Sequence, residues 1–430
     1  MASFFYSLHW LFVIGAMALS WRRSGAVFHP HIMFTTMICI QIVDFLVRGY
    51  DDGNLTYIPI DNVYGYQIVI LFTLSALLLL TMFIRSKELE RHCKKAFSEI
   101  SVGPALRIVL FFVALVLVGA DLFKRFSTVD WSASEVIRQS LMPRGQRDWD
   151  QAQFAGNFVF AITTILLPLA GLVAGYLTSV GNVALRFGSA LLLLLVLAML
   201  ITNGSRTPVV MVICSTGLFW YVAQRAATVR TVVIGATALA IAASTSVMYL
   251  TRAYGLTPSP FAPQRELEIT YHMDDNYYRA IFAYDYADQG IEYWDPIAFF
   301  WTLAVNPIPR AIWEDKPLFT EQFYGGYKLS YVTNTFLGET VAMTGVTLSI
   351  LVAPIIGLLL YLILFRAQRL LTRPMGLMAY LIVALYVYMC VRSLANLTQF
   401  MYLPAAAVGL VTFLGRKRVM HRATAFGRLR

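Results

Sequence analysis

Long apolar runs, separated by short polar stretches, follow one another along most of the chain. Eleven of them reach or approach the roughly 20 residues that a membrane-spanning helix needs. They lie at about 3–20, 26–47, 64–84, 107–123, 154–177, 187–202, 208–223, 231–250, 340–365, 376–396 and 398–414. Backbone groups in a bilayer must pair within their own segment, so each run favours a helix. The pattern predicts an all-α polytopic membrane protein with about eleven transmembrane helices.

The longest stretch without a spanning run covers residues 251–339. Within it, 296–306 is apolar but too short to cross a bilayer. We expect this segment to form a helix that lies at the membrane interface or enters the membrane only partly. Residues 1–430 are therefore expected to form one integral membrane domain with one large outer loop.

Composition agrees with the pattern, because 58% of the residues are hydrophobic and only 13% are charged. Soluble domains carry roughly 25% charged residues, so a soluble globular enzyme and a disordered chain are excluded. The four cysteines form no CxxC pair, which argues against a disulfide framework or a structural zinc site.

The basic residues indicate the orientation of the spans. With the N-terminus outside, the inner segments hold 20 Lys and Arg against three acidic residues. The inner side then carries +17 and the remainder −7, which together give the chain's net charge of +10. Cytoplasmic loops of membrane proteins carry such an excess of Lys and Arg. The charge therefore reports topology, and nucleic acid is not an expected partner.

The inner loops are too short to hold a nucleotide-binding domain, and no GxxxxGK[ST] motif occurs. We therefore expect the chemistry on the outer face, without a nucleotide. Asp44, Asp121 and Arg392 lie at or near the outer ends of apolar runs. We expect these three side chains to reach the water around the headgroups.

The outer turn 203–208, Asn-Gly-Ser-Arg-Thr-Pro, joins two apolar runs. Pro208 is suited to the start of the next helix, whose free N–H groups and dipole attract anions. Arg206 adds a cation, so the turn is a candidate phosphate site. The alternative is a polar hairpin with an arginine that reaches toward the headgroups.

The segment 306–317, Asn-Pro-Ile-Pro-Arg-Ala-Ile-Trp-Glu-Asp-Lys-Pro, contains three prolines that disfavour regular helix. It carries Arg310, which can bind a pyrophosphate bidentately, and Lys316, which acts as a point charge. Trp313 lies between them and is a candidate for covering a sugar face. The alternative is an interfacial loop anchored by these same side chains.

Residues 271–279 interleave carboxylates with aromatic rings, as sugar sites do. Asp274, Asp275 and His272 are candidates for a general base. Tyr277 and Tyr278 are candidates for covering a sugar face, and Arg279 adds a cation. An ordinary interfacial belt of aromatic residues is the alternative.

Glu339 begins the apolar run after Gly338. A carboxylate is favourable at a helix N-terminus, so a capping role and a catalytic role both fit this residue. The acidic residues do not have the spacing of a metal site, and no metal or other cofactor is expected.

Three sequences together resemble a known family: GSRTP between two spans, NPIPRAIWEDKP in the large outer loop, and FLGETVAMTGVTLSILVAPIIGLLLYL. They are similar to the Wzy-type polymerases of bacterial surface polysaccharides, also called O-antigen or oligosaccharide repeat unit polymerases. The likeness in layout covers nearly the whole chain, and the likeness in residues covers about 200–210 and 305–360.

The resemblance implies a type C glycosyltransferase-like architecture in the bacterial inner membrane, with the N-terminus and the large loop in the periplasm and the C-terminus in the cytoplasm. It implies that a glycan on undecaprenyl pyrophosphate is transferred to an incoming lipid-linked repeat unit. A chain-length regulator is a further implied partner. Arg206 and Arg310 occupy the motifs in which the family has functional arginines.

Two other activities fit the same layout. An O-antigen ligase uses the same donor with lipid A core, the anchor of lipopolysaccharide, as its acceptor. A flippase for lipid-linked oligosaccharides would need a charged cavity at mid-span, whereas the charges here gather in outer loops.

Overall fold

The structure is a computed structural model, in which every regular element of the described chain is helical. It describes residues 11, 14–15, 18–19, 22, 29–40, 60–83, 103–140, 142, 148, 158–202, 206–224, 226–254, 275–290, 294–306, 308, 313, 315–317, 335–373, 375–399, 401–402, 404–409 and 411–412. The expected all-α class is confirmed at this coarse level.

In the described part of the chain, three helices are long and apolar enough to cross a membrane: Pro104–Ser127, Val183–Thr202 and Phe336–Leu371. Shorter apolar helices accompany them, among them Pro208–Ala223, Thr228–Ser244 and Gly376–Arg392. These helices are consistent with a polytopic membrane protein, as the apolar runs predicted.

The chain divides into two compact units. The first combines Met1–Ile100 with Thr270–Arg430. Its helices are α2 (Pro30–Ile40), α4 (Ile60–Phe83), α13 (Asp275–Asp288), α14 (Pro296–Val305), α16 (Phe336–Ala367), the 3-10 helix η3 (Gln368–Thr372), α17 (Gly376–Arg392) and α18 (Asn396–Gln399).

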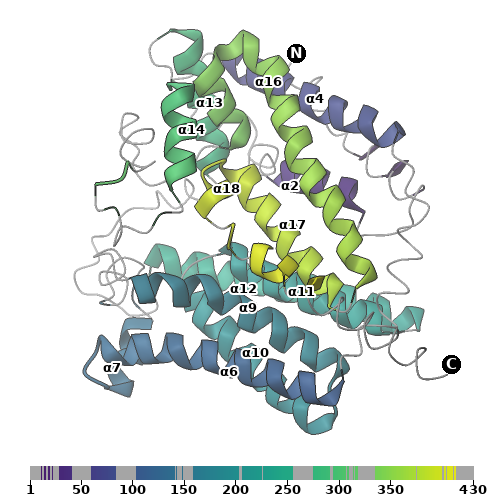
Figure 1. The fold of residues 1–430 in the computed structure, drawn as a ribbon, viewed down its shortest axis with the longest axis vertical. Coiled ribbons are helices and arrows are strands. Elements are labelled where there is room, and N and C mark those ends of the chain that lie inside the picture. The colour runs from purple at the N-terminus through teal and green to yellow at the C-terminus, as the bar shows by residue number, and fades with distance from the viewer. Residues whose placement is uncertain are drawn as a thin grey trace, which may run out of the picture. The chain divides into compact units, whose positions relative to one another are not determined.

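Helix α16 is central to the first unit, because α13, α4, α17 and α2 all pack against it (Figure 1). Its N-terminal part is buried without interruption from Phe336 to Met343. Gly345, at φ 74° and ψ 171°, interrupts the helical geometry after this buried part. A glycine tolerates a positive φ at little steric cost. The buried start of α16 is therefore set off from the rest of the helix.

The second unit is Ser101–Ile269. Its helices are α6 (Pro104–Ser127), α7 (Ala133–Ser140), α9 (Phe158–Val180), α10 (Val183–Thr202), α11 (Arg206–Ala223) and α12 (Ala227–Tyr254). Helix α9 packs against α10, α6 and α11. A Cβ at Gly175 of α9 would lie 2.1 Å from Thr216 Oγ1 of α11, so this contact requires a glycine. Small residues allow such close packing of apolar helices.

The expected runs agree with helix positions to within a few residues in most of the described chain. Helix ends differ more in some places: the run 376–396 was expected to continue, but α17 ends at Arg392, and Ser393 is extended at φ −170° and ψ 135°. The expected span 398–414 contains short helical pieces in its described part. The first expected span lies largely outside the described residues.

Helix α14 confirms that the apolar run at 296–306 is helical. Asp295 precedes it and accepts a hydrogen bond from the N–H of Ile297 at 2.9 Å. Ten residues of helix extend about 15 Å, half of a bilayer core. Its location at a membrane interface stays a prediction, as does the single integral domain.

Candidate functional site

Helix α13 carries the motif of acids and aromatic rings. It begins at Asp275, where a carboxylate favours the helix N-terminus. Tyr277, Tyr278 and Arg279 follow in the same helix, and the side chains of these four residues lie outside the described part. His272 and Asp274 also lie outside the described residues. Their proposed roles stay predictions.

One face of α13 is buried against α16 and α4 through Ala280, Ile281, Tyr284 and Ala287. These positions follow helical spacing, which places them on one side. The segment with the candidate sugar-binding residues is thus anchored to the start of the central helix by its own apolar side.

An aromatic and hydroxyl contact joins α4, α13 and α16. The hydroxyls of Tyr66 and Thr335 lie 2.8 Å apart. Thr335 also accepts a hydrogen bond from the N–H of Gly338 at 3.1 Å and so caps α16. The ring of Tyr284 meets that of Tyr66 edge to face, with 6.4 Å between centroids. Three segments distant in sequence are fixed at this point.

Gly65 makes room for this contact. A Cβ at this position would lie 2.0 Å from the hydroxyl oxygen of Tyr284, which is closer than side chains tolerate. Burial, followed by the charge of Asp288, raises the pKa of Tyr284 to about 12. The phenol is therefore neutral at physiological pH and available as a hydrogen-bond donor.

Glu339 lies in the first turn of α16 and is fully buried. One carboxylate oxygen accepts from Ser393 Oγ and the other from the N–H of Leu394, both at 2.6 Å. Ser393 Oγ in turn accepts from the N–H of Ala395 at 3.2 Å. We call Glu339, Ser393 and Leu394 the carboxylate clamp, because it holds the break between α17 and α18.

The clamp bears on the two roles, capping and catalysis, that the sequence left open for Glu339. Thr335, rather than Glu339, caps α16. The carboxylate binds a segment more than 50 residues later in the chain, and both of its oxygens accept hydrogen bonds from it. Sequence reasoning missed Ser393 and Leu394; the polar break at 393–399 between two apolar runs was the available signal.

The proline-rich segment after α14 is tied back to the end of that helix. Lys316 Nζ donates to the carbonyl oxygens of Asn306 and Ile308, each at 2.7 Å. Asn306 Nδ2 also lies 3.4 Å from Thr398 Oγ1 of α18. Trp313 is half-buried, and Arg310 lies outside the described residues. Lys316 therefore binds the backbone of its own segment through these two hydrogen bonds.

Arg206 belongs to the second unit, where it is the first residue of α11. The sequence predicted that the helix would begin at Pro208, two residues later. Pro208 is instead in the first turn, where a missing N–H costs little. The prediction of a helix N-terminus beside Arg206 is confirmed. The side chain of Arg206 lies outside the described part, so its approach to a phosphate stays a prediction.

The second unit also contains a buried ion pair near the end of α6. Asp121 Oδ2 lies 3.0 Å from Arg125 Nε, and the two side chains are 1% and 3% exposed. The expectation that Asp121 reaches water is therefore wrong. Helix α6 continues to Ser127, beyond the predicted end at 123, and so brings Lys124 and Arg125 into the buried part of the helix. Asp44 lies outside the described residues, and Arg392 is half-buried.

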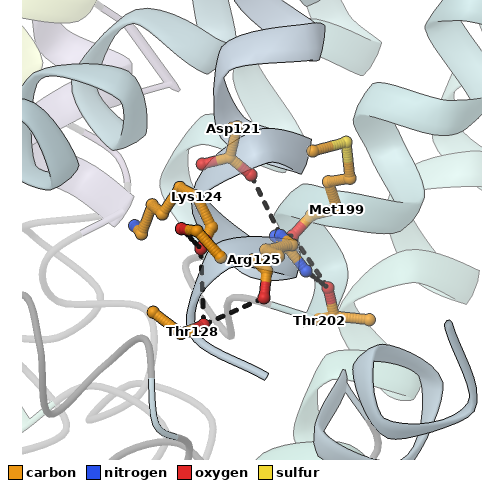
Figure 2. Close-up of polar contacts among 7 residues, drawn as sticks. Asp121, Lys124, Arg125, Thr128, Met199 and Thr202 are labelled. Carbon is orange, nitrogen blue, oxygen red and sulfur yellow. Dashed lines mark hydrogen bonds and ion pairs between the residues drawn. The ribbon is translucent and has the colours of Figure 1, made fainter. Parts of the chain in front are cut away.

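Sequence reasoning also missed Arg125, whose Nη1 donates to Thr202 Oγ1 of α10 at 3.2 Å (Figure 2). The spacing of Asp121 and Arg125, four residues apart, was a usable signal because such residues are neighbours on a helix. Thr202 lies in another helix and no sequence pattern indicated it.

Among the described residues, no group of three or more His, Cys, Asp or Glu side chains lies close enough together to hold a metal ion. The arrangement thus offers cations, acids and aromatic rings on three segments of the first unit, and one helix N-terminus with an arginine in the second.

Comparison with protein-family models, with curated proteins and with solved structures found no match to this chain.

Proposed function

We propose that the chain is a glycosyltransferase that polymerises lipid-linked repeat units of a bacterial surface polysaccharide. In this proposal it spans the inner membrane about eleven times, with its N-terminus in the periplasm and its C-terminus in the cytoplasm. Its substrates are two undecaprenyl pyrophosphate-linked glycans, one the donor and one the acceptor. The likeness of three sequence motifs to Wzy-type polymerases motivates the proposal.

One structural observation carries the proposal furthest: contacts between helices of the first unit link three of the candidate segments. Tyr284 of α13 contacts Tyr66, and Tyr66 contacts the residue that caps α16. Asn306 joins the segment 306–317 to α18. The carboxylate clamp in turn joins the residues between α17 and α18 to α16. The described parts of these segments, which are separated by tens of residues, thus belong to one compact unit.

The chemistry needs few groups. The acceptor hydroxyl attacks the anomeric carbon of the donor glycan; a carbon–oxygen bond forms there as the bond to pyrophosphate breaks. The bonding electrons leave with the pyrophosphate oxygen, and the hydroxyl proton passes to a base. Cations that stabilise the departing charge lower the barrier. We assign this task to Arg206 and Arg310.

The hydrogen bonds already described refine two of the assignments. Both oxygens of Glu339 accept from the protein, so we assign this residue to positioning and look for the base among His272, Asp274 and Asp275. Lys316 donates to two backbone carbonyls of the segment that carries Arg310. We therefore assign Lys316 to holding that segment in shape.

The proposal is tested by complementing a deletion strain with single variants and measuring the length of the surface glycan. Arg206→Ala and Arg310→Ala are expected to leave only single repeats. The matched control is Arg138→Ala, which removes an arginine that is 61% exposed on α7 and lies in the outer segment predicted between the spans 107–123 and 154–177. This control is expected to retain full-length polymer.

The deletion itself separates the competing activities. Loss of a polymerase leaves one repeat on the lipid A core, whereas loss of a ligase leaves none. Loss of a flippase leaves the lipid-linked repeat on the cytoplasmic side. Full-length polymer in both arginine variants would overturn the assignment of these cations.

A further inference from the structure

A buried ionic group joins the last turns of two helices in the second unit (Figure 2). The Nε of Arg125, on α6, donates a hydrogen bond to Oδ2 of Asp121 at 3.0 Å. Its other two nitrogens cross to α10: one donates to Thr202 Oγ1 at 3.2 Å and the other to the carbonyl oxygen of Met199 at 3.1 Å. We call these four residues the α6–α10 bracket.

The bracket satisfies a group that a helix end leaves open. The last four carbonyls of a helix have no partner within it, and Met199 is among them in α10. Thr202 Oγ1 donates to the same carbonyl at 2.9 Å. A guanidinium presents its donors in a rigid, planar fork, so the two bonds to α10, with the third nitrogen held by Asp121, fix the end of α10 in direction as well as in distance.

The part of α6 that presents Arg125 is itself firmly held. The hydroxyl of Ser127 donates to the carbonyl of Lys124, and that of Thr128 donates to the carbonyl of Arg125, both at 2.9 Å. Trp131 stacks on Phe126 beyond the helix end. Figure 2 shows Lys124 directed to the opposite side of α6 from Thr202. Arg125 is thus the side chain that connects this fixed end to α10.

Stability alone does not account for the bracket. Replacing a buried ion pair with apolar residues is often neutral or stabilising, because desolvation offsets the attraction. Asp121 Oδ1 is buried and makes no hydrogen bond to any described residue, which adds a cost. What the ion pair supplies, and an apolar contact would not, is a fixed orientation of Arg125.

The candidate phosphate site directly follows the bracket in the sequence. Thr202 ends α10, and Arg206 begins α11 four residues later. Four residues of chain reach at most about 14 Å, so the position of Thr202 limits that of Arg206. We propose that Arg125, oriented by Asp121, is a positioning residue that holds the end of α10, and through it the start of α11, so that Arg206 meets the pyrophosphate of the donor. This inference rests on the proposed function.

The test compares Thr202→Val, which removes the hydroxyl at nearly constant shape, with Thr202→Ser, which keeps it. The full chain is placed in lipid nanodiscs, and turnover is measured against the concentration of its lipid-linked repeat unit. Thr202→Val is expected to raise KM about ten-fold, the loss of a hydrogen bond to a charged group, with kcat little changed. Thr202→Ser is expected to match the wild type.

A second measurement follows the turn itself, independently of activity. A spin label on Ser205→Cys is read by electron paramagnetic resonance after the four native cysteines have been replaced by alanine. Thr202→Val and Asp121→Asn are expected to sharpen the spectrum, because the turn gains mobility; Thr202→Ser is expected to leave it unchanged.

The outcomes separate the two proposals. A purely structural loss would lower kcat with the folded fraction and leave KM unchanged. If Arg206→Ala abolishes polymer while Thr202→Val keeps both the wild-type KM and the wild-type spectrum, the positioning role is overturned and the polymerase stands. If the wild type makes no polymer, the proposed function fails with this inference, and the spectra then report only whether the bracket holds the turn.

Discussion

Replacement of Glu339 by glutamine tests the carboxylate clamp most sharply. Glutamine keeps the volume of the side chain and one acceptor oxygen, so Ser393 Oγ retains a partner. The other oxygen becomes an NH2 group, which faces the N–H of Leu394, formerly 2.6 Å from a carboxylate oxygen. One charge-assisted hydrogen bond is lost, and two donors are brought together at a fully buried position.

The expected magnitude lies between two limits. Hydrogen bonds to charged groups contribute about 1.5–3 kcal/mol each, whereas hydrogen bonds between membrane helices average about 0.6 kcal/mol. Glu339 is ionisable and completely buried at the end of an apolar run, which favours the upper range. We expect Glu339→Gln to cost about 2 kcal/mol of unfolding free energy, and Glu339→Ala about 3–4 kcal/mol because it removes both bonds and leaves a cavity.

The assay is reversible unfolding of the purified chain in mixed micelles, followed by tryptophan fluorescence. Ser393→Ala completes a double-mutant cycle with Glu339→Ala, which removes the partner of the Ser393 hydroxyl, and a coupling energy of about 1 kcal/mol is expected. The matched control is Glu135→Gln, which alters a carboxylate bound to Arg138 on the exposed surface of α7. Its unfolding is expected to match the wild type. Wild-type stability in Glu339→Gln would refute the clamp.

Three further predictions concern the first unit. Gly65→Ala places a Cβ 2.0 Å from the hydroxyl oxygen of Tyr284 and is expected to lower the melting temperature; Tyr284→Phe in the same chain is expected to restore part of the loss, and no rescue would contradict the contact. The raised pKa of Tyr284, about 12 against 10.0, means that the folded chain retains a proton that the unfolded chain releases above pH 10. The free energy of unfolding is therefore expected to fall as the pH rises above 10, less steeply in Tyr284→Phe than in the wild type. Parallel pH dependences of the two proteins would count against the raised pKa of Tyr284. Lys316→Met frees the carbonyls of Asn306 and Ile308 and is expected to speed proteolysis at 306–317, whereas Lys417→Met, in the C-terminal tail, is not. Equal cleavage rates for wild type and Lys316→Met would refute this role.

The apolar runs predicted the helices well because the information is local. The run at 187–202 corresponds to α10, Val183–Thr202, and that at 208–223 to α11, Arg206–Ala223. Helix ends were harder, since polar residues continue a helix wherever other groups satisfy them. Helix α6 extends past its apolar run because Arg125 donates hydrogen bonds to Asp121, one turn earlier, and to Thr202 in another helix.

Partners far apart in sequence were beyond prediction for a physical reason. Glu339 and Ser393 are 54 residues apart, and Arg125 and Thr202 are 77 apart. Their pairing depends on which helices pack together, and apolar periodicity does not determine that for segments that are apolar on every side. The motifs themselves, at 203–208, 271–279 and 306–317, were visible from composition, but their geometry was not.

The most direct test of the central claim is a reaction with the purified chain. The protein is reconstituted in nanodiscs with its lipid-linked repeat unit as the sole glycan, and the products are separated by length. A polymerase is expected to give a ladder of glycans on lipid pyrophosphate, with one undecaprenyl pyrophosphate released for each bond formed, and no ladder is expected with Arg310→Ala. Lipid-linked glycan that stays at one repeat, with no undecaprenyl pyrophosphate released by the wild type, would contradict it.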